Sequence, residues 1–261
     1  IPGGARYLPD VFMTFAGASV MVNAKTQGAF PAAKALLSAV YEGAQVPFDT
    51  ALKIEARWFT NILMNPSSGA MMRSLFINKE ALEKGAVRPK NIPDQKVKNV
   101  GVLGAGMMGA GISYVSAMAG IEVILLDMKK EDAKKGKTHA ENLLNIGIKR
   151  KKITEEKKLT VLNLIKPTIE FTDLGECDLI VEAVFEDPTI KAEVTKKAEA
   201  IIAKDCIFAT NTSTLPITSL ASASVRPEQF IGIHFFSPVD KMLLVEIIKG
   251  NATGDKAVAK A

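Results

Sequence analysis

The sequence has few of the residues that build metal centres and disulfide frameworks. Its 261 residues include two cysteines and two histidines. Cys177 and Cys206 stand at or next to the starts of predicted strands, and neither has a partner at the spacing of a metal-binding motif. We therefore expect no metal site, and we expect buried, reduced thiols of the kind found in a reducing compartment.

Long apolar runs and a strong charge bias are also missing. No apolar segment reaches the ~20 residues that span a bilayer, so no transmembrane segment is expected. The net charge is +5, and eleven basic residues meet five acidic ones between Lys129 and Lys158 with no aromatic residue among them. This pattern argues against a nucleic-acid partner. The segment is either a solvated helical face or a site for a phosphorylated ligand centred on Lys149, Arg150, Lys151 and Lys152.

The chain divides into two regions of different composition. Residues 1–92 are rich in Ala, Met and Phe and predict helices, among them 29–43, 48–64 with Asp49 as its N-cap, and 69–84. The segment 88–96, RPKNIPDQK, reads as a linker. From Val97 onward, strands are expected at 97–103, 121–126, 168–171, 178–184, 206–210, 230–235 and 243–248. Helices are expected at 107–119, 129–151, 154–165, 188–203 and 216–223. The alternation predicts an α/β fold of Rossmann type, a doubly wound and mostly parallel sheet preceded by a helical linker segment.

The most informative stretch is residues 97–127, VKNVGVLGAGMMGAGISYVSAMAGIEVILLD. An apolar strand leads into Gly104, Gly106 and Gly109 in the pattern G-x-G-x-x-G, then a helix, a second apolar strand and Asp127. Gly104 permits a tight turn, Gly106 lets the backbone approach a pyrophosphate, and Gly109 lets the helix pack on the strand. Asp127 can accept hydrogen bonds from both ribose hydroxyls and repels a 2′-phosphate, which favours NAD over NADP, although two lysines follow closely. The alternative is a glycine-rich turn of purely structural use.

Polar residues collect where the predicted strands end, and three of them suggest acid–base chemistry. His234 ends an apolar strand, and Glu246 interrupts another, so the carboxylate is expected to have a partner. Ser213 follows the strand CIFAT. A histidine paired with a carboxylate suits a general base, and a serine hydroxyl suits a hydrogen bond to a substrate oxygen. With an NAD site, this set fits oxidation of a secondary alcohol. Alternatively, Ser213 caps a helix and Glu246 faces solvent; His139 is expected to be solvated.

Four strings within residues 97–250 resemble the 3-hydroxyacyl-CoA dehydrogenase family, in particular the dehydrogenase part of the multifunctional fatty-acid oxidation enzymes (alpha subunit). They are GVLGAGMMGAGI, VEAVFED, CIFATNTSTLPI and IGIHFFSPVDKMLLVEII. The resemblance implies that His234 is the general base, that Glu246 pairs with it and that Ser213 contacts substrate. It also implies NAD contacts at Met108, Asp127, Val184, Phe185, Glu186, Lys191 and Ser213. Many members have Asn at the position of Ser237, and the trifunctional and peroxisomal-type members have Ser there, as this chain does.

The resemblance also implies a domain plan. Residues 1–92 are similar to the end of an enoyl-CoA hydratase half with its linker helix, 97–250 to the NAD-binding dehydrogenase domain, and 251–261 to the start of a truncated C-terminal domain. The implied activity is NAD-dependent oxidation of 3-hydroxyacyl-CoA in β-oxidation by a fragment of a bifunctional protein. The alternative is a module that binds NAD with little turnover. A thiolase beta subunit is an implied partner, with residues 149–152 near the CoA. The implied compartment is the bacterial cytoplasm, or the mitochondrial matrix or peroxisome in a eukaryote.

Overall fold

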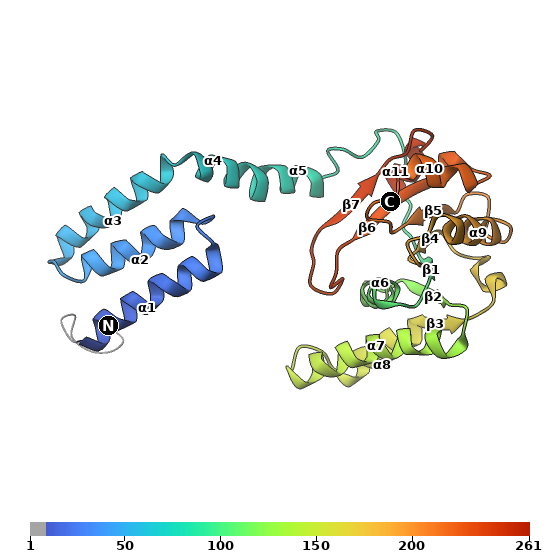
Figure 1. Ribbon diagram of the computed structural model, residues 1–261, viewed down its shortest axis with the longest axis horizontal. Coiled ribbons are helices and arrows are strands. Elements are labelled where there is room, and N and C mark those ends of the chain that lie inside the picture. Colours follow the sequence, from blue (N-terminus) through green and yellow to red (C-terminus); the bar gives the residue numbers. More distant parts are fainter. Residues whose placement is uncertain (1–8) are drawn as a thin grey trace. The chain divides into compact units, whose positions relative to one another are not determined.

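The chain forms two units, Ile1–Val87 and Arg88–Ala261. The computed structural model describes residues 9–261 (Figure 1). Residues 88–96 contain neither helix nor strand, in keeping with their two prolines. No helix in the described range is both long and apolar enough to cross a membrane.

The first unit is helical from its first described residue. Its elements are α1 (Pro9–Thr26), α2 (Pro31–Gly43), α3 (Phe48–Leu63), α4 (Pro66–Met72), the π-helix η1 (Arg73–Asn78) and α5 (Lys79–Glu83). The expected N-cap at Asp49 is wrong, because Pro47 holds that position and Asp49 lies in the first turn. The helix expected at 69–84 begins earlier, at Pro66, because the Asn65 side chain accepts a hydrogen bond from the Ser67 N–H and caps it.

This helical unit has little interior of its own. Its fully buried hydrophobic residues among those described are Val11 and Ala35. α3 contains no buried residue, and Phe48 and Phe59 on that helix are 75% and 66% exposed. Helix α3 is held against α2 through Glu42, which accepts a hydrogen bond from Trp58 Nε1 at 3.0 Å and pairs with Arg57.

The second unit is built on a seven-stranded sheet with the order β3-β2-β1-β4-β5-β6-β7, which confirms the predicted doubly wound fold. The strands are β1 (Asn99–Leu103), β2 (Glu122–Leu126), β3 (Ile165–Thr168), β4 (Leu179–Glu182), β5 (Ile207–Thr210), β6 (Phe230–Phe235) and β7 (Val245–Ile248). All neighbours pair in parallel except β6 and β7, which are antiparallel. The chain order reverses between β1 and β4, so the carboxyl ends of these strands border the crevice where such folds bind ligands.

Helices cover both faces of this sheet (Figure 1). They are α6 (Met107–Met118), α7 (Lys130–Lys149), α8 (Glu155–Leu164), α9 (Pro188–Glu199), α10 (Ile217–Leu220) and α11 (Asp255–Lys260). α6, α7 and α8 pack on one face around Val102 and Leu125, and α9 and α10 pack on the other around Leu103 and Ile180. Because successive strand residues point to opposite faces, the near-continuous apolar strands are buried on both sides.

The strand expected at 168–171 is misplaced by three residues. β3 spans Ile165–Thr168, and Phe171–Leu174 is a 3₁₀ helix, η2. Ile165 leaves α8 directly and pairs with Val123 of β2, and it is 1% exposed. Pro167 lacks an N–H, which the strand tolerates because β3 lies at the edge of the sheet. Phe171 and Ile169 are thereby free to line a cavity.

Candidate functional site

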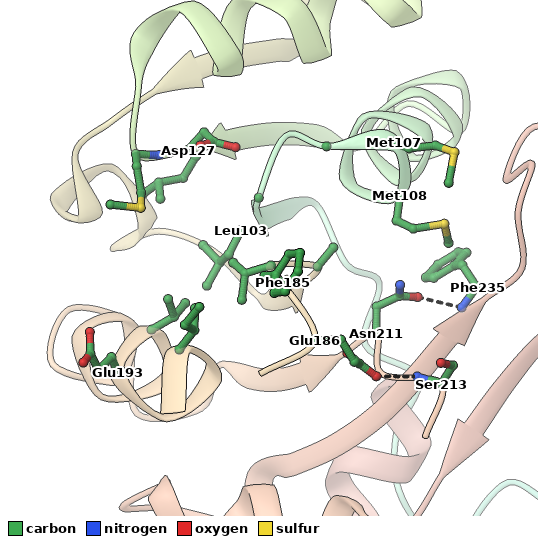
Figure 2. Close-up of a pocket in the computed structure, with 18 of the residues that line it drawn as sticks. Leu103, Met107, Met108, Asp127, Phe185, Glu186, Glu193, Asn211, Ser213 and Phe235 are labelled. Carbon is green, nitrogen blue, oxygen red and sulfur yellow. Dashed lines mark hydrogen bonds between the residues drawn. The ribbon is translucent and has the colours of Figure 1, made fainter. Parts of the chain in front are cut away.

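A cavity of about 1130 Å³ opens at the carboxyl ends of the parallel strands. It is lined by Leu103, Gly104, Gly106, Met107, Met108, Leu126, Asp127, Met128, Ile169, Phe171, Ala183, Val184, Phe185, Glu186, Ile190, Glu193, Val194, Lys197, Asn211, Ser213, His234, Phe235, Phe236 and Ser237. Figure 2 shows Asp127 at one side of this space and Glu186, Asn211 and Ser213 at another. The volume is large enough for a dinucleotide-sized ligand.

The glycine loop between β1 and α6 has the geometry of a phosphate cradle. Gly104 has φ +95°, and a Cβ added there would lie 2.7 Å from the Ala183 carbonyl oxygen. A Cβ on Gly109 would lie 1.8 Å from the Gly104 carbonyl oxygen, so only glycine lets α6 pack this closely. At Gly106 a Cβ would meet nothing within 4 Å and would project into open space beside the start of α6. The residues therefore fit a pyrophosphate over the free N–H groups of α6, whose N-cap supplies no side-chain acceptor.

Asp127 directly follows β2 and is hydrogen-bonded to the glycine loop. Its Oδ2 accepts a hydrogen bond from the Ala105 N–H, and its Oδ1 accepts one from the Met128 N–H, both at 2.7 Å. These bonds fix the carboxylate beside the glycine turn, and Asp127 lines the cavity. A carboxylate held in this way suits the two hydroxyls of an adenosine ribose.

A buried charged cluster lies beneath the cavity. Glu182 ends β4 and is 1% exposed, and Lys191 on α9 is 2% exposed. The Lys191 Nζ donates to both carboxylate oxygens of Glu182, at 2.8 and 3.1 Å. Glu182 also accepts from Thr210 Oγ1 at 2.7 Å and from the Val184 N–H at 2.8 Å. The buried charges are thus paired and hydrogen-bonded, as burial requires.

Glu186 connects this cluster to the wall of the cavity. Its Oε2 lies 3.2 Å from Lys191 Nζ, and its Oε1 accepts from Thr212 Oγ1 at 2.5 Å and from the Ser213 N–H at 3.2 Å. Partial burial acts to raise the pKa of Glu186, but the bonds from Thr212 and Lys191 outweigh it, so the pKa is lowered and the group stays ionised. Glu186 therefore fixes the loop that carries Ser213.

His234 and Glu246 face each other across the antiparallel pair of β6 and β7. The His234 Nδ1 lies 2.9 Å from a Glu246 carboxylate oxygen, and their side chains are 15% and 49% exposed. Because Nδ1 is engaged by the carboxylate, Nε2 is left to exchange a proton on the cavity side. The ring also packs against Phe236, with centroids 4.5 Å apart.

Most residues that the sequence assigns to the site come together here. Gly104, Gly106, Met108, Asp127, Val184, Phe185, Glu186, Ser213 and His234 line the cavity. Glu246 lies behind His234 and does not line it. Gly109 and Lys191 also lie outside the lining; Gly109 packs on the turn, and Lys191 lies behind Glu186. The predicted direct contacts of Gly109 and Lys191 with NAD stay predictions. His139 is exposed, as expected.

Several residues of the site have no role assigned from sequence. Glu182 and Asn211 stand at the carboxyl ends of β4 and β5. The Asn211 side chain accepts a hydrogen bond from the Phe235 N–H at 2.8 Å and holds the strand that bears His234. A signal for Glu182 exists in the sequence, because it is a lone charge within the apolar run LIVEAV. Ile190, Glu193, Val194 and Lys197 form a cavity-facing stripe on α9 at helical spacing. Within residues 9–261, no group of three or more His, Cys, Asp or Glu is arranged to hold a metal ion.

Comparison with known proteins agrees with this geometry. Residues 99–261 match the family model "3-hydroxyacyl-CoA dehydrogenase, NAD binding domain". The chain is 37% identical over 248 residues to the fatty acid oxidation complex subunit alpha of Psychrobacter cryohalolentis, covering 95% of this chain and 34% of that protein. It is 38% identical to the same subunit of Pseudomonas syringae pv. syringae, covering 96% of this chain and 34% of that protein. The chain thus spans about a third of the length of these curated relatives.

Solved structures point the same way. An (S)-3-hydroxybutyryl-CoA dehydrogenase from Ralstonia eutropha is 37% identical with a TM-score of 0.62, covering 63% of this chain and 58% of that one. The dehydrogenase part of multifunctional enzyme 1 from C. elegans is 34% identical with a TM-score of 0.59, covering 65% of this chain and 39% of that one. The family model alone covers more than half of the chain, and it matches the unit that contains the glycine loop, Asp127 and the His234–Glu246 pair. The chain therefore belongs to the 3-hydroxyacyl-CoA dehydrogenase family, and its second unit carries that family's NAD-binding domain.

Proposed function

We propose that this chain is the dehydrogenase-bearing portion of a protein that oxidises 3-hydroxyacyl-CoA to 3-oxoacyl-CoA with NAD in fatty-acid β-oxidation. The observation that carries the proposal is the His234–Glu246 pair, 2.9 Å apart, with His234 lining the cavity that also contains the glycine loop. A base and a dinucleotide cradle in one cavity are what alcohol oxidation requires.

His234, Glu246 and Ser213 have different roles in the proposed oxidation. His234 Nε2 takes the proton from the C3 hydroxyl, and Glu246 orients the ring and stabilises its charged form. The Ser213 hydroxyl has no hydrogen-bond partner among the described residues and donates to the substrate oxygen. NAD, when bound, supplies the acceptor for the hydride that leaves C3. Glu186 and Asn211 hold the loop and strand that set these groups.

NAD is held by the glycine loop and Asp127 at one side of the cavity. Met108, Val184, Phe185, Glu186 and Ser213 continue the contact surface toward His234. Lys191 acts through Glu186 in this arrangement, because its ammonium group faces the two carboxylates.

Residues 1–92 are proposed to be the end of an enoyl-CoA hydratase half with its linker helix, and 251–261 the start of the C-terminal domain. The similarity to fatty acid oxidation complex alpha subunits extends over 95% of the chain and so includes the helical unit. The exposed apolar side chains of α3 are consistent with a unit that packs against further protein. A thiolase beta subunit is the proposed partner of the whole protein, and the bacterial relatives favour a cytoplasmic location.

The second candidate is an NAD-binding module with little or no turnover. It is favoured by coverage of only a third of the relatives' length and by the 99% exposure of Leu243 in the segment that joins β6 to β7. The two candidates are separated by adding 3-hydroxybutyryl-CoA and NAD to this chain and to the full-length protein, and following NADH. We expect the chain to bind NAD but to turn over slowly, because water reaches the site, and the full-length protein to be active. If the full-length protein binds NAD but forms no NADH, the dehydrogenase proposal is contradicted and the NAD-binding module is supported.

The exposed basic segment Lys149, Arg150, Lys151 and Lys152 is proposed to attract the phosphates of CoA. It runs from the last residue of α7 toward α8 and lies outside the cavity lining. Binding of acetoacetyl-CoA should weaken with rising salt and with Lys→Ala changes in this segment, since exposed charges are screened. A matched change of Lys134 and Lys135, which are also exposed on α7, should have less effect. If the two sets of changes weaken acetoacetyl-CoA binding equally, or not at all, the segment is a solvated helical face and not a CoA site.

A further inference from the structure

The charges of Glu182, Glu186 and Lys191, which lie in and beneath the cavity wall near Ser213, do not sum to zero. Glu182 and Lys191 are both buried, and Lys191 donates to both oxygens of Glu182. This pair is neutral as a unit. Glu186 is a second carboxylate on the same ammonium group, at 3.2 Å. The cluster of Glu182, Glu186 and Lys191 therefore carries one surplus negative charge.

The surplus charge resides on Glu186 and faces the cavity. Glu186 is 39% exposed and lines the cavity, whereas Glu182 is sealed beneath it. Its other partners, the Thr212 hydroxyl and the Ser213 N–H, are neutral donors. These donors keep the carboxylate ionised and fixed without compensating its charge.

Glu186 also lies at the side of the cavity where hydride transfer is proposed. Figure 2 shows it beside Ser213 and close to Asn211 and Phe235, well apart from Asp127 and from Glu193. The nicotinamide must lie next to the carbon whose hydroxyl contacts His234 and Ser213. Its ring is a cation in NAD⁺ and is neutral in NADH, so a fixed anion in this wall acts on the two forms differently.

We propose that Glu186 biases cofactor binding toward the oxidised form through the surplus negative charge of the Glu182–Lys191–Glu186 cluster. The bias lowers the reduction potential of the bound cofactor relative to a neutral site and assists release of NADH after each oxidation. The inference rests on the proposed function, because that function sets the nicotinamide beside His234.

The test is the ratio of the dissociation constants of NADH and NAD⁺, measured by calorimetric titration at low ionic strength. Glu186→Gln keeps the shape and removes the charge. We expect it to lower the ratio Kd(NADH)/Kd(NAD⁺) on the order of tenfold, the effect of one partly screened unit charge near the ring. Glu186→Ala, a second uncharged variant, should lower it similarly, and Glu186→Asp should keep it within about threefold of the parent.

Glu193→Gln is the matched control, since it makes the same charge change on the same cavity wall but away from Ser213. Its ratio should stay within about twofold of the parent. An unchanged ratio in Glu186→Gln, or an equal change in Glu193→Gln, would overturn the inference. The ratio of dissociation constants is measured without turnover. A chain that binds neither NAD⁺ nor NADH would contradict the cofactor site itself. A shifted ratio in a protein that never oxidises the substrate would support the charge effect of Glu186 and contradict the proposed reaction.

Discussion

Two pairs of a carboxylate with a nitrogen base stand at the carboxyl side of this sheet, and they differ in burial. Glu182 and Lys191 are 1% and 2% exposed, and the Glu182 carboxylate accepts hydrogen bonds from Lys191, the Val184 N–H and the Thr210 hydroxyl. His234 and Glu246 are 15% and 49% exposed on the last two strands, and the pair has one contact of 2.9 Å. The buried pair cannot change its charge without cost to the fold, whereas the exposed pair can exchange protons with a ligand or solvent. Burial thus separates the pair that holds the site from the pair proposed to react.

The largest stability effect should come from breaking the buried pair. Lys191→Met leaves Glu182 as an unpaired buried carboxylate and should lower the free energy of unfolding by about 3–5 kcal/mol. Denaturation in urea followed by circular dichroism measures this change. Lys166→Met, which breaks the exposed pair of Lys166 with Glu122 at 2.6 Å, is the control and should cost less than about 1 kcal/mol. Similar losses in the two variants would contradict the contrast between buried and exposed pairs.

A smaller effect is expected at Asp127, whose carboxylate is fixed by the Ala105 and Met128 N–H groups. Asp127→Ala should weaken NAD binding by about 1.5–3 kcal/mol, the range of a charge-assisted hydrogen bond, and should reduce the preference over NADP. Calorimetric titration with each cofactor measures both. Asp132→Ala, five residues further on and paired with Lys135, should leave NAD affinity unchanged. Equal affinities of the parent chain for NAD and NADP would remove the assigned role of Asp127.

Glu246→Gln should change stability little, in contrast to Lys191→Met. Glu246 is half exposed on the edge strand, so the free energy of unfolding should fall by less than about 1 kcal/mol. The same urea denaturation applies. A loss as large as that of Lys191→Met would show that the His234–Glu246 pair also supports the fold.

The smallest chemical reactivity is expected at the two thiols, which are free and buried. Burial raises the pKa of both Cys177 and Cys206 to about 12, with nearby acidic groups contributing at Cys177. Both thiols should therefore stay protonated and unreactive toward iodoacetamide at about pH 8 in the native chain and become reactive in urea. Mass spectrometry of the alkylated chain measures this. Rapid labelling of native protein would contradict their burial.

The sequence predicted those parts of the site that are local or that break a pattern. The glycine loop and Asp127 lie within one strand–helix–strand unit, so spacing alone brings them together. Glu246 was expected to have a partner because it is a charge within an apolar strand, and the antiparallel register then sets it opposite His234. Asp49 as an N-cap and the strand at 168–171 were wrong, because neighbouring proline and the pairing of Ile165 decided those boundaries.

The rest depends on contacts between elements that no local pattern reports. Glu182, Lys191 and Thr210 come from β4, α9 and β5. The bonds from Lys191 to Glu182 follow from the packing of α9 against the sheet, and the bond from Thr210 follows from the register of β4 and β5. The cavity-facing stripe of Ile190, Glu193, Val194 and Lys197 has the same origin, since the face that α9 turns to the sheet determines which residues remain for the cavity.

The central claim is that His234 is the base in a site whose NAD-binding part is independent of it. The most direct measurement compares the full-length parent with its His234→Ala variant, with NAD affinity from calorimetric titration and turnover from NADH formation on 3-hydroxybutyryl-CoA. We predict that turnover falls on the order of 10²–10⁴-fold, the usual contribution of a positioned general base, while the dissociation constant for NAD stays within about twofold. A variant that keeps its turnover, or one that loses NAD affinity as steeply as activity, would contradict the account.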